Sequence, residues 1–228
     1  MSVHLQRQFD RLKKSILTLG ALVEEAVEKA IRAAESRDGA LAQQVIDGDQ
    51  RIDLMELDVE EECLHTLALH QPVAFDLRFV VATLKINSDL ERIGDLAANI
   101  AEQTIMLGEQ PAPAELPMDL RAQGRSVRTM LKRSLDALVN VDPDEAQAVR
   151  EADTRVDEVH RQTYRNVAQA IRDRPDHVEQ MIQLLSISRR LERIADHCCN
   201  IAEDVLYMAR GEMARHHGLA RSENRAGD

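Results

Sequence analysis

Four pairs of carboxylates, each pair four positions apart, are the side chains best placed to do chemistry. They recur at matching places in the two halves of the chain: Asp49 and Asp53, Glu91 and Asp95, Asp153 and Asp157, and Glu192 and Asp196. At about 100° per residue, two helical side chains four positions apart lie within about 40° of one face. Stacked acids repel one another by about 0.2–0.5 kcal/mol per pair, and a bound multivalent cation would reverse that repulsion. Each pair is therefore a candidate part of a metal site.

The chemistry of these pairs restricts the cations that they would hold. Carboxylate oxygens suit Mg²⁺, Ca²⁺, Mn²⁺ and iron, and Zn²⁺ also accepts them, although its structural sites favour Cys and His. Four further side chains share these helix faces and are secondary candidates: Asn99, Glu102, Asn200 and Glu203. An isolated acidic pair is usually a solvated face, and neighbouring arginines such as Arg92 and Arg193 offset part of the charge. The pattern alone leaves metal binding and a solvated acidic face both open.

An internal repeat positions these pairs. Residues 90–102 read LERIGDLAANIAE and residues 191–203 read LERIADHCCNIAE, with nine of thirteen positions identical at an offset of 101. Upstream, Asp49, Arg51 and Asp53 recur 104 positions later. Self-similarity at this period predicts a tandem duplication of units of about 100 residues, a common domain size.

Each repeat is predicted to form three helices. Aromatic residues make up only 2% of the chain, and nine Gly and six Pro leave few turns for short strands. Helical spacing of apolar residues and breaks at Pro72 and Pro175 delimit the expected helices: 5–35, 38–70, 74–107, 118–140, 143–172 and 175–210. The fold class is therefore all-α, with two tandem three-helix bundles over 1–108 and 118–210, a proline-containing linker over 109–117 and a flexible tail over 211–228.

Composition argues against several classes of function. The 29 basic and 40 acidic residues give a net charge of −11, which offers no broad footprint for nucleic acid or an anionic membrane. No apolar run is long enough to enter a membrane, and the polar N-terminus has no signal-peptide core. Three cysteines do not form a disulfide framework and suit a reducing cytoplasm. No phosphate loop, nucleophile elbow or obvious orthophosphate pocket is present, so we expect no enzyme.

Two alternatives remain beside a metal-binding scaffold. A ferritin-like di-iron carboxylate enzyme needs two E-x-x-H motifs, but only Glu62 and His65 fit, and the duplicate positions hold Asn166 and Gln169. A metal-free helical adaptor is the other alternative. The run His197, Cys198 and Cys199 suggests a soft-metal cluster, but consecutive helical residues point in different directions. We expect the two cysteines to be small buried residues.

The repeated segments resemble a known family. The stretches SDLERIGDLAANIAE and RRLERIADHCCNIAE, with the duplicated D-x-x-x-D pairs, are similar to the PhoU family of phosphate transport accessory and regulatory proteins, over about residues 1–210. The resemblance implies two three-helix bundles and multinuclear clusters of iron or zinc, with Mg or Mn as other candidates. The implied ligands are Asp49, Asp53, Glu91 and Asp95 in one half and Asp153, Asp157, Glu192 and Asp196 in the other. The second half departs from the first, because His160 and Tyr164 stand where Glu56 and Glu60 stand earlier.

The same resemblance implies a function. It predicts a negative regulator that restrains phosphate uptake and represses the phosphate-starvation regulon when phosphate is plentiful. The implied partners are the ATPase subunit of the phosphate ABC transporter and the phosphate-sensing histidine kinase, between which the chain would act as a helical adaptor. The resemblance also implies a homodimer, and the sequence does not locate its interface.

Overall fold

Six long α-helices and one short 3₁₀ turn account for nearly all of the chain that the computed structural model describes, residues 3–108 and 118–211. They are α1 (Val3–Ser36), α2 (Gly39–His70), α3 (Ala74–Gly108), α4 (Leu120–Asn140), α5 (Pro143–Asp173), η1 (Pro175–His177) and α6 (Val178–Arg210). No strand occurs within those two ranges, which confirms the all-α fold class. The expected linker over 109–117, and the expected tail beyond residue 211, lie outside the described residues.

Aspartate caps set the starts of three helices. The Asp38 carboxylate accepts a hydrogen bond from the Leu41 amide at 3.0 Å, which fixes the start of α2. Asp142 caps α5 in the same way, with Pro143 at the first helical position. Helix α4 begins two residues later than the sequence predicts, because Asp119 caps it.

The turn before α6 also differs from the prediction. Residues 175–177 form a 3₁₀ turn, so α6 itself begins at residue 178 instead of 175. Arg174 has φ −141° and ψ 77°, outside the α-helical region that a following proline disfavours. The proline therefore ends α5 and displaces the start of α6 by three residues.

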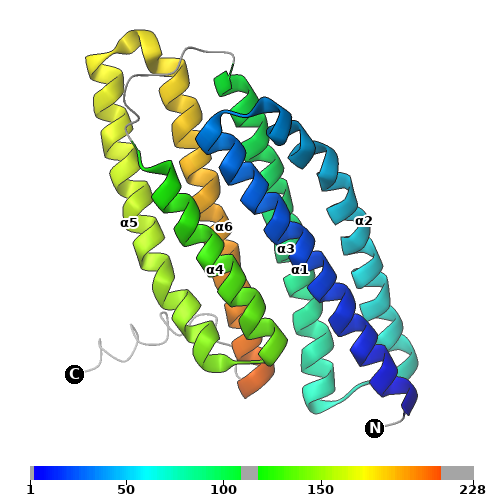
Figure 1. Ribbon diagram of the computed structural model, residues 1–228. Helices are drawn as coiled ribbons and strands as arrows, with labels where there is room; N and C mark the ends of the chain where they lie inside the picture. Colours follow the sequence, from blue (N-terminus) through cyan, green and yellow to red (C-terminus); the bar gives the residue numbers. More distant parts are fainter. Residues whose placement is uncertain (1–2, 109–117, 212–228) are drawn as a thin grey trace, which may run out of the picture.

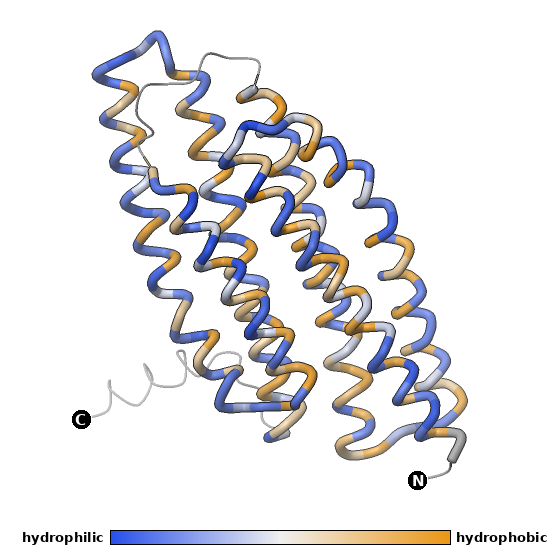
Figure 2. Tube along the Cα trace, viewed as in Figure 1, coloured by the Kyte–Doolittle hydropathy of each residue, from blue (hydrophilic) through white to orange (hydrophobic). Residues whose placement is uncertain are grey.

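Each repeat folds into a bundle around an apolar seam. The predicted inward residues of α1 are all buried: Leu12, Ile16, Leu19, Val23, Val27, Ala30 and Ala34. Hydrophobic and hydrophilic residues alternate along every helix (Figure 2), as expected for helices that bury one face and expose the other. In Figure 1 the first bundle, α1 to α3, lies beside the second, α4 to α6, with α1 against α4 and α3 against α6.

The two bundles pack with approximate two-fold symmetry, which two glycines make visible. A Cβ atom at Gly20 of α1 would lie 2.8 Å from the Leu135 side chain of α4, and one at Gly124 of α4 would lie 2.6 Å from the Ile31 side chain of α1. Gly20 and Gly124 are equivalent in the repeat, as are Ile31 and Leu135. Each glycine therefore admits the large residue of the other bundle.

Polar contacts join α3 to α6 along the second line of contact. The Nδ1 atom of His197 lies 2.7 Å from Oδ1 of the buried Asp89, and the Asn200 amide donates to the same oxygen at 3.1 Å. Lys85 pairs with the buried Asp204 at 3.2 Å. These contacts tie the repeats together near the acidic faces. No helix in the described ranges has the length and apolarity needed to cross a membrane.

Candidate metal centres

The first acidic cluster lies between α2 and α3. Helix α2 contributes Asp49 and Asp53, and α3 contributes Glu91 and Asp95. One carboxylate oxygen from each of Asp49, Asp53 and Asp95 lies within 4.8 Å of the others. Glu91 lies close enough to Asp95 and Asp53 for their charges to raise its pKa, after the larger effect of burial. The structure thus brings the four predicted residues of the first repeat together.

A glycine allows the two helices of the first cluster to approach closely. A Cβ at Gly94 would lie 3.1 Å from the Ile52 side chain and 3.5 Å from Oδ1 of Asp49. In the second repeat the equivalent positions hold Ala195 and Val156. The larger residue on α6 is thus matched by a smaller one on α5, so the two repeats place a similar total side-chain volume at this contact.

Asp49 of the first cluster has a buried carboxylate oxygen and a strongly raised pKa. Its Oδ1 atom is buried and has no hydrogen-bond partner in the described ranges. Burial, reinforced by the charges of Asp53, Asp95 and Glu102, raises the pKa of Asp49 to about 6. An unpartnered buried oxygen among like charges is the donor that a cation would satisfy.

The second acidic cluster repeats this arrangement between α5 and α6. Burial, followed by the charges of Asp157 and Asp196, raises the pKa of Asp153 to about 6. Its Oδ1 atom is also buried and has no hydrogen-bond partner, as at Asp49 in the first repeat. Burial and the charges of Asp196 and Asp157 also raise the pKa of Glu192. The four predicted residues of the second repeat therefore lie near one another, but no three of them bring ligand atoms within 4.8 Å.

The two clusters are not identical. Within the described residues, only Asp49, Asp53 and Asp95 place three ligand atoms within 4.8 Å of one another. Cys199 lies beside Asp153 in the second cluster, where the first repeat has Ala98, and its thiol acts to lower the pKa of Asp153 against the larger effect of burial. Of the two cysteines expected to be small buried residues, Cys198 is buried and Cys199 is only partly buried. The place of Cys199 beside Asp153 was not predicted, because a single thiol on an acidic face has no distinctive spacing.

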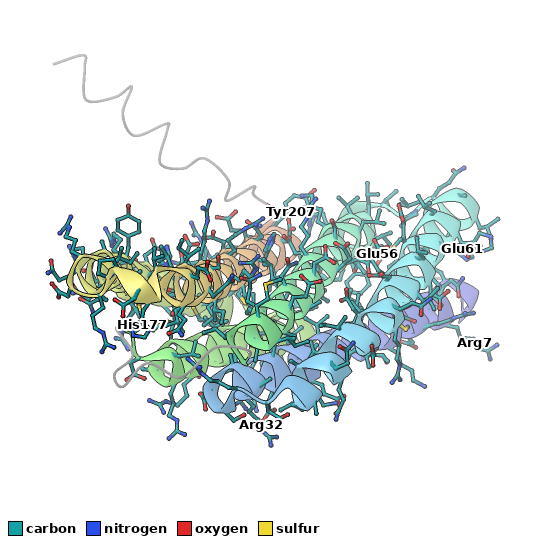
Figure 3. All side chains as sticks on the ribbon, turned by 90° about the horizontal axis from the view of Figure 1, so that it is seen from above. Arg7, Arg32, Glu56, Glu61, His177 and Tyr207 are labelled. Carbon is teal, nitrogen blue, oxygen red and sulfur yellow. The ribbon has the colours of Figure 1, made fainter. Side chains whose placement is uncertain are left out.

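Glu56 and His160 occupy equivalent places and have different roles. In Figure 3 Glu56 lies between α2 and α3, whereas Glu61 lies on the outer side of α2. Glu56 accepts a hydrogen bond from the Asn87 amide at 3.0 Å. Its replacement His160 has Nδ1 2.9 Å from the Ser188 hydroxyl, and burial lowers the pKa of this imidazole, with Arg189 adding to the effect. Glu56 is a fifth carboxylate near the first cluster, and a neutral imidazole takes its place in the second.

The secondary candidates mostly have other partners. Asn99 donates to the Asp95 carbonyl of its own helix at 2.6 Å, and Glu203 lies 3.5 Å from Arg150. Asn200 of α6 donates a hydrogen bond to Asp89 of α3, so its side chain points toward the other bundle. Glu102 alone stays near the first cluster, where its charge acts on Asp49.

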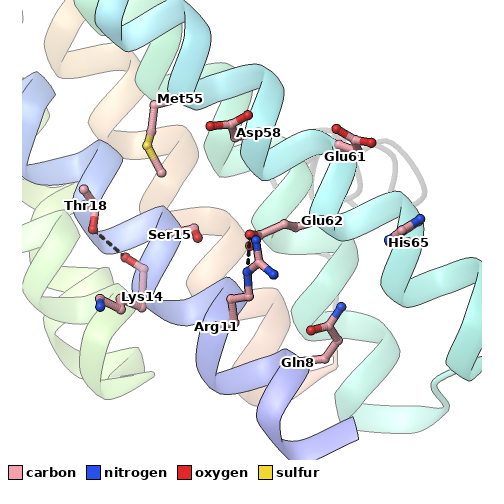
Figure 4. Close-up of a pocket in the computed structure, with 10 residues that line it drawn as sticks. All are labelled: Gln8, Arg11, Lys14, Ser15, Thr18, Met55, Asp58, Glu61, Glu62 and His65. Atoms are coloured by element: carbon pink, nitrogen blue, oxygen red, sulfur yellow. Dashed lines mark hydrogen bonds and ion pairs between the residues drawn. The ribbon is translucent and has the colours of Figure 1, made fainter. Parts of the chain in front are cut away.

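The E-x-x-H motif of the ferritin-like alternative lies in a different place. Glu62 forms an ion pair with Arg11 at 2.7 Å, on the wall of a cavity of about 630 Å³ between α1 and α2 (Figure 4). His65 is exposed on the same wall. An arginine already neutralises this carboxylate, so the geometry gives the di-iron alternative no support.

The donor sets fit a cation. Each cluster offers four carboxylates from two helices and one buried oxygen without a hydrogen bond, and oxygen donors of this kind suit hard or borderline divalent ions. Bound there, an ion would neutralise the mutual repulsion and link two helices of one bundle.

Comparison with known proteins yields one family over most of the chain. The family model described as PhoU domain matches residues 16–104 and again residues 120–205. The phosphate-specific transport system accessory protein PhoU homolog of Pseudomonas putida is 36% identical over 222 residues, which cover 96% of this chain and 87% of that protein. Each of the two domain matches falls within one three-helix bundle.

Two solved structures share the fold. The crystal structure of PhoU from Pseudomonas aeruginosa has a TM-score of 0.88 at 35% identity, and the match covers 91% of this chain and 99% of that one. The phosphate transport system regulatory protein PhoU from Streptococcus pneumoniae has a TM-score of 0.81 at 31% identity, covering 92% and 99%. The arrangement of both bundles, and not only of one repeat, is therefore shared.

Proposed function

Because this chain belongs to the PhoU family, we propose that it is an accessory regulator of phosphate transport that restrains phosphate uptake and represses the phosphate-starvation regulon. The observation that carries the proposal is the double match to the PhoU domain, one match in each bundle. It is supported by relatives named as accessory proteins of the phosphate-specific transport system, at 36% identity over 96% of this chain.

The proposed mechanism is that of an adaptor without catalytic activity. One surface would bind the ATPase subunit of the phosphate ABC transporter and another the phosphate-sensing histidine kinase, with preference for the inactive state of each. An adaptor shifts a signalling equilibrium only by its difference in affinity for the two states. Two joined bundles with similar but unequal faces, such as Glu56 against His160, suit the binding of two different partners. Both partners would be met in the cytoplasm, which is the location that we propose.

We propose that metal ions occupy the two acidic clusters and brace the helices. Iron or zinc is the family expectation, and Mg or Mn also suits the donors. The support is the pair of equivalent buried oxygens, on Asp49 and Asp153, that have no hydrogen-bond partner in the described ranges. A metal-free adaptor is the competing possibility, and metal analysis of native-source protein separates the two.

We also propose that the chain forms a homodimer through the outer face of α2. Leu54, Leu57 and Leu64 are each more than half exposed and recur at spacings of three and seven residues. That spacing places them on one side of the helix, and a contiguous exposed apolar patch is a surface that a second copy of the chain can cover. Leu57→Glu should convert the dimer to a monomer in light scattering.

The function is tested in a strain that lacks this chain and carries a reporter for phosphate starvation. At high phosphate, the full chain should repress the reporter, and it should retain both the ATPase subunit and the kinase in a pull-down. Asp49→Asn with Asp153→Asn should weaken repression, whereas the exposed control Asp58→Asn should not. Absence of repression together with absence of binding to either partner would contradict the proposal.

A further inference from the structure

A second kind of site lies where the two repeats meet, and its charge is opposite to that of the acidic clusters. A cavity of about 290 Å³ lies between α3 and α6 and is lined by Leu96, Asn99, Ser186, Arg189, Arg190 and Arg193. We call it the arginine pocket. Three guanidinium groups share one small cavity in a chain whose net charge is −11. Such a concentration of positive charge needs an explanation.

No carboxylate in the described ranges forms an ion pair with these three arginines. The only hydrogen bond that they donate there runs from Arg190 to the Ser186 carbonyl oxygen at 3.2 Å. Glu102 lies near Arg190, but no ion pair joins the two side chains. By contrast, Arg133 and Arg150 elsewhere in the same bundle do form ion pairs with glutamates.

The repeat symmetry explains why the pocket is cationic. On the equivalent side of the α3–α6 contact, Asp89 accepts from Asn200 and contacts His197. At the equivalent positions of the other repeat, Arg190 corresponds to Asp89 and Leu96 corresponds to His197, whereas Asn99 and Asn200 are the same residue type. One side of the contact thus contains its own anion and the groups that hold it. The other side has hydrogen-bond donors, and within the described residues no anion forms an ion pair with them, although Glu102 lies nearby.

We infer that the arginine pocket binds a tetrahedral oxyanion of the phosphate type, either free orthophosphate or a phosphoryl group on a larger molecule. Guanidinium groups match the oxygen geometry of phosphate and form charge-assisted hydrogen bonds with it. The Asn99 amide and the Ser186 hydroxyl add neutral groups able to bond the remaining oxygens. The cavity volume of about 290 Å³ accommodates an oxyanion with some of its water. Because both helices line the pocket, a bound anion would also link the two repeats.

The inference does not depend on the proposed metals or regulatory partners. Calorimetric titration of the full chain with sodium phosphate tests it. Metal is first removed with a chelator, so that phosphate cannot bind to a metal ion instead of to the pocket. We expect saturable binding with a Kd of about 1 mM or tighter at low ionic strength, weakened by added salt. Absence of heat up to about ten times that concentration would overturn the inference.

Matched variants locate the binding. Arg193 and Arg92 occupy the same position of the two repeated segments, both are exposed, and only Arg193 lines the pocket. Arg193→Gln should weaken phosphate binding about tenfold or more, because it removes a charge-assisted contact, whereas Arg92→Gln should leave it within about twofold. Arg189→Gln is a second pocket variant with the same expectation. Equal weakening by Arg92→Gln, or none by either pocket variant, would overturn the assignment.

Titrations with two other anions identify the source of the bound oxyanion. Titration with adenosine monophosphate supplies the phosphoryl group on a larger molecule, and titration with sulfate tests charge and shape alone. Tighter binding of orthophosphate than of the nucleotide would assign the pocket to the free anion, and the reverse order would assign it to a phosphorylated ligand. Either order supports the inference if Arg193→Gln weakens the binding, and overturns it if the variant has no effect.

Discussion

Replacing Asp49 by Asn should stabilise the metal-free protein, although it removes a predicted metal ligand. Burial and neighbouring carboxylates raise the pKa of Asp49 from 3.8 to about 6, so the folded state binds its proton more tightly than the unfolded state does. For a carboxyl with a raised pKa, stability falls as pH rises through this window and the loss is complete above it. The charged form therefore destabilises the fold at neutral pH.

The magnitude follows from the shift. One pKa unit corresponds to 1.36 kcal/mol, so a rise from 3.8 to about 6 sets an upper value of roughly 3 kcal/mol. Asp49 is only half-buried, and water screens its neighbours, so we expect Asp49→Asn to contribute roughly 1–2 kcal/mol at pH 7. For a chain of this size that corresponds to a rise in Tm of about 2–8 °C.

Bound metal should make the wild-type chain more stable than Asp49→Asn, which reverses the order expected in chelator. At an ion concentration about one hundred times Kd, binding to the folded state alone stabilises it by about 2.7 kcal/mol. The wild-type chain should gain this in Mn²⁺ or Zn²⁺, and Asp49→Asn should lose it at the first cluster. Thermal unfolding of both proteins in chelator and in metal, at pH 7 and at pH 4.5, gives the eight Tm values needed. The stabilising effect of the variant in chelator should shrink at pH 4.5, where Asp49 is already protonated in the wild-type fold.

The control is Asp58→Asn on the same helix. Asp58 is exposed, so its replacement should change stability by less than about 0.5 kcal/mol in either medium. The reasoning is refuted if Asp49→Asn lowers the Tm in chelator, or if it keeps the full metal-dependent rise.

Three further changes test the packing. Gly94→Ala introduces a Cβ atom 3.1 Å from the Ile52 side chain, and Ile52→Val should relieve the contact. A double-mutant cycle in urea should show a favourable coupling of about 0.5 kcal/mol or more between the two changes, and additive effects would contradict the contact. Gly124→Ala places a Cβ 2.6 Å from an α1 side chain and should cost about 1–2 kcal/mol by the same measurement, with no loss if the bundles separate freely. Asp89→Ala leaves His197 without its acceptor and should cost about 1–3 kcal/mol, and an unchanged urea midpoint would refute the role of this contact.

Much of the fold follows from local signals in the sequence. Proline and aspartate mark the helix ends, as at Asp38 and Pro143, and apolar spacing identifies the buried faces. The repeat then requires the second half to fold like the first. These features act within about one helix length, so they can be read directly from the residues.

The packing of the two bundles was not predictable in the same way. The contacts of Gly20 with Leu135 and of Asp89 with His197 join residues more than one hundred positions apart. A glycine within a helix has several explanations until its neighbour is known. The arginine pocket was missed for the same reason, since Asn99 and Arg190 come from different repeats.

For the acidic clusters, the sequence predicted the residues and the structure added their environment. The spacing of four positions placed Asp49 and Asp53 on one face, but it did not distinguish a solvated face from a site. The buried, unpartnered oxygen of Asp49 and the close approach of α2 and α3 at Gly94 are tertiary features. These tertiary features favour a cation site over a solvated acidic face.

The central claim is that two equivalent acidic clusters hold metal ions in a phosphate regulator. Diffraction from crystals of native-source protein, measured on both sides of the iron and zinc absorption edges, tests it most directly. We predict anomalous peaks at two places, one against Asp49 and Asp95 between α2 and α3 and one against Asp153 and Asp196 between α5 and α6. The claim would be contradicted by fully ordered clusters without a peak at either edge and without other cation density, or by metal bound only elsewhere.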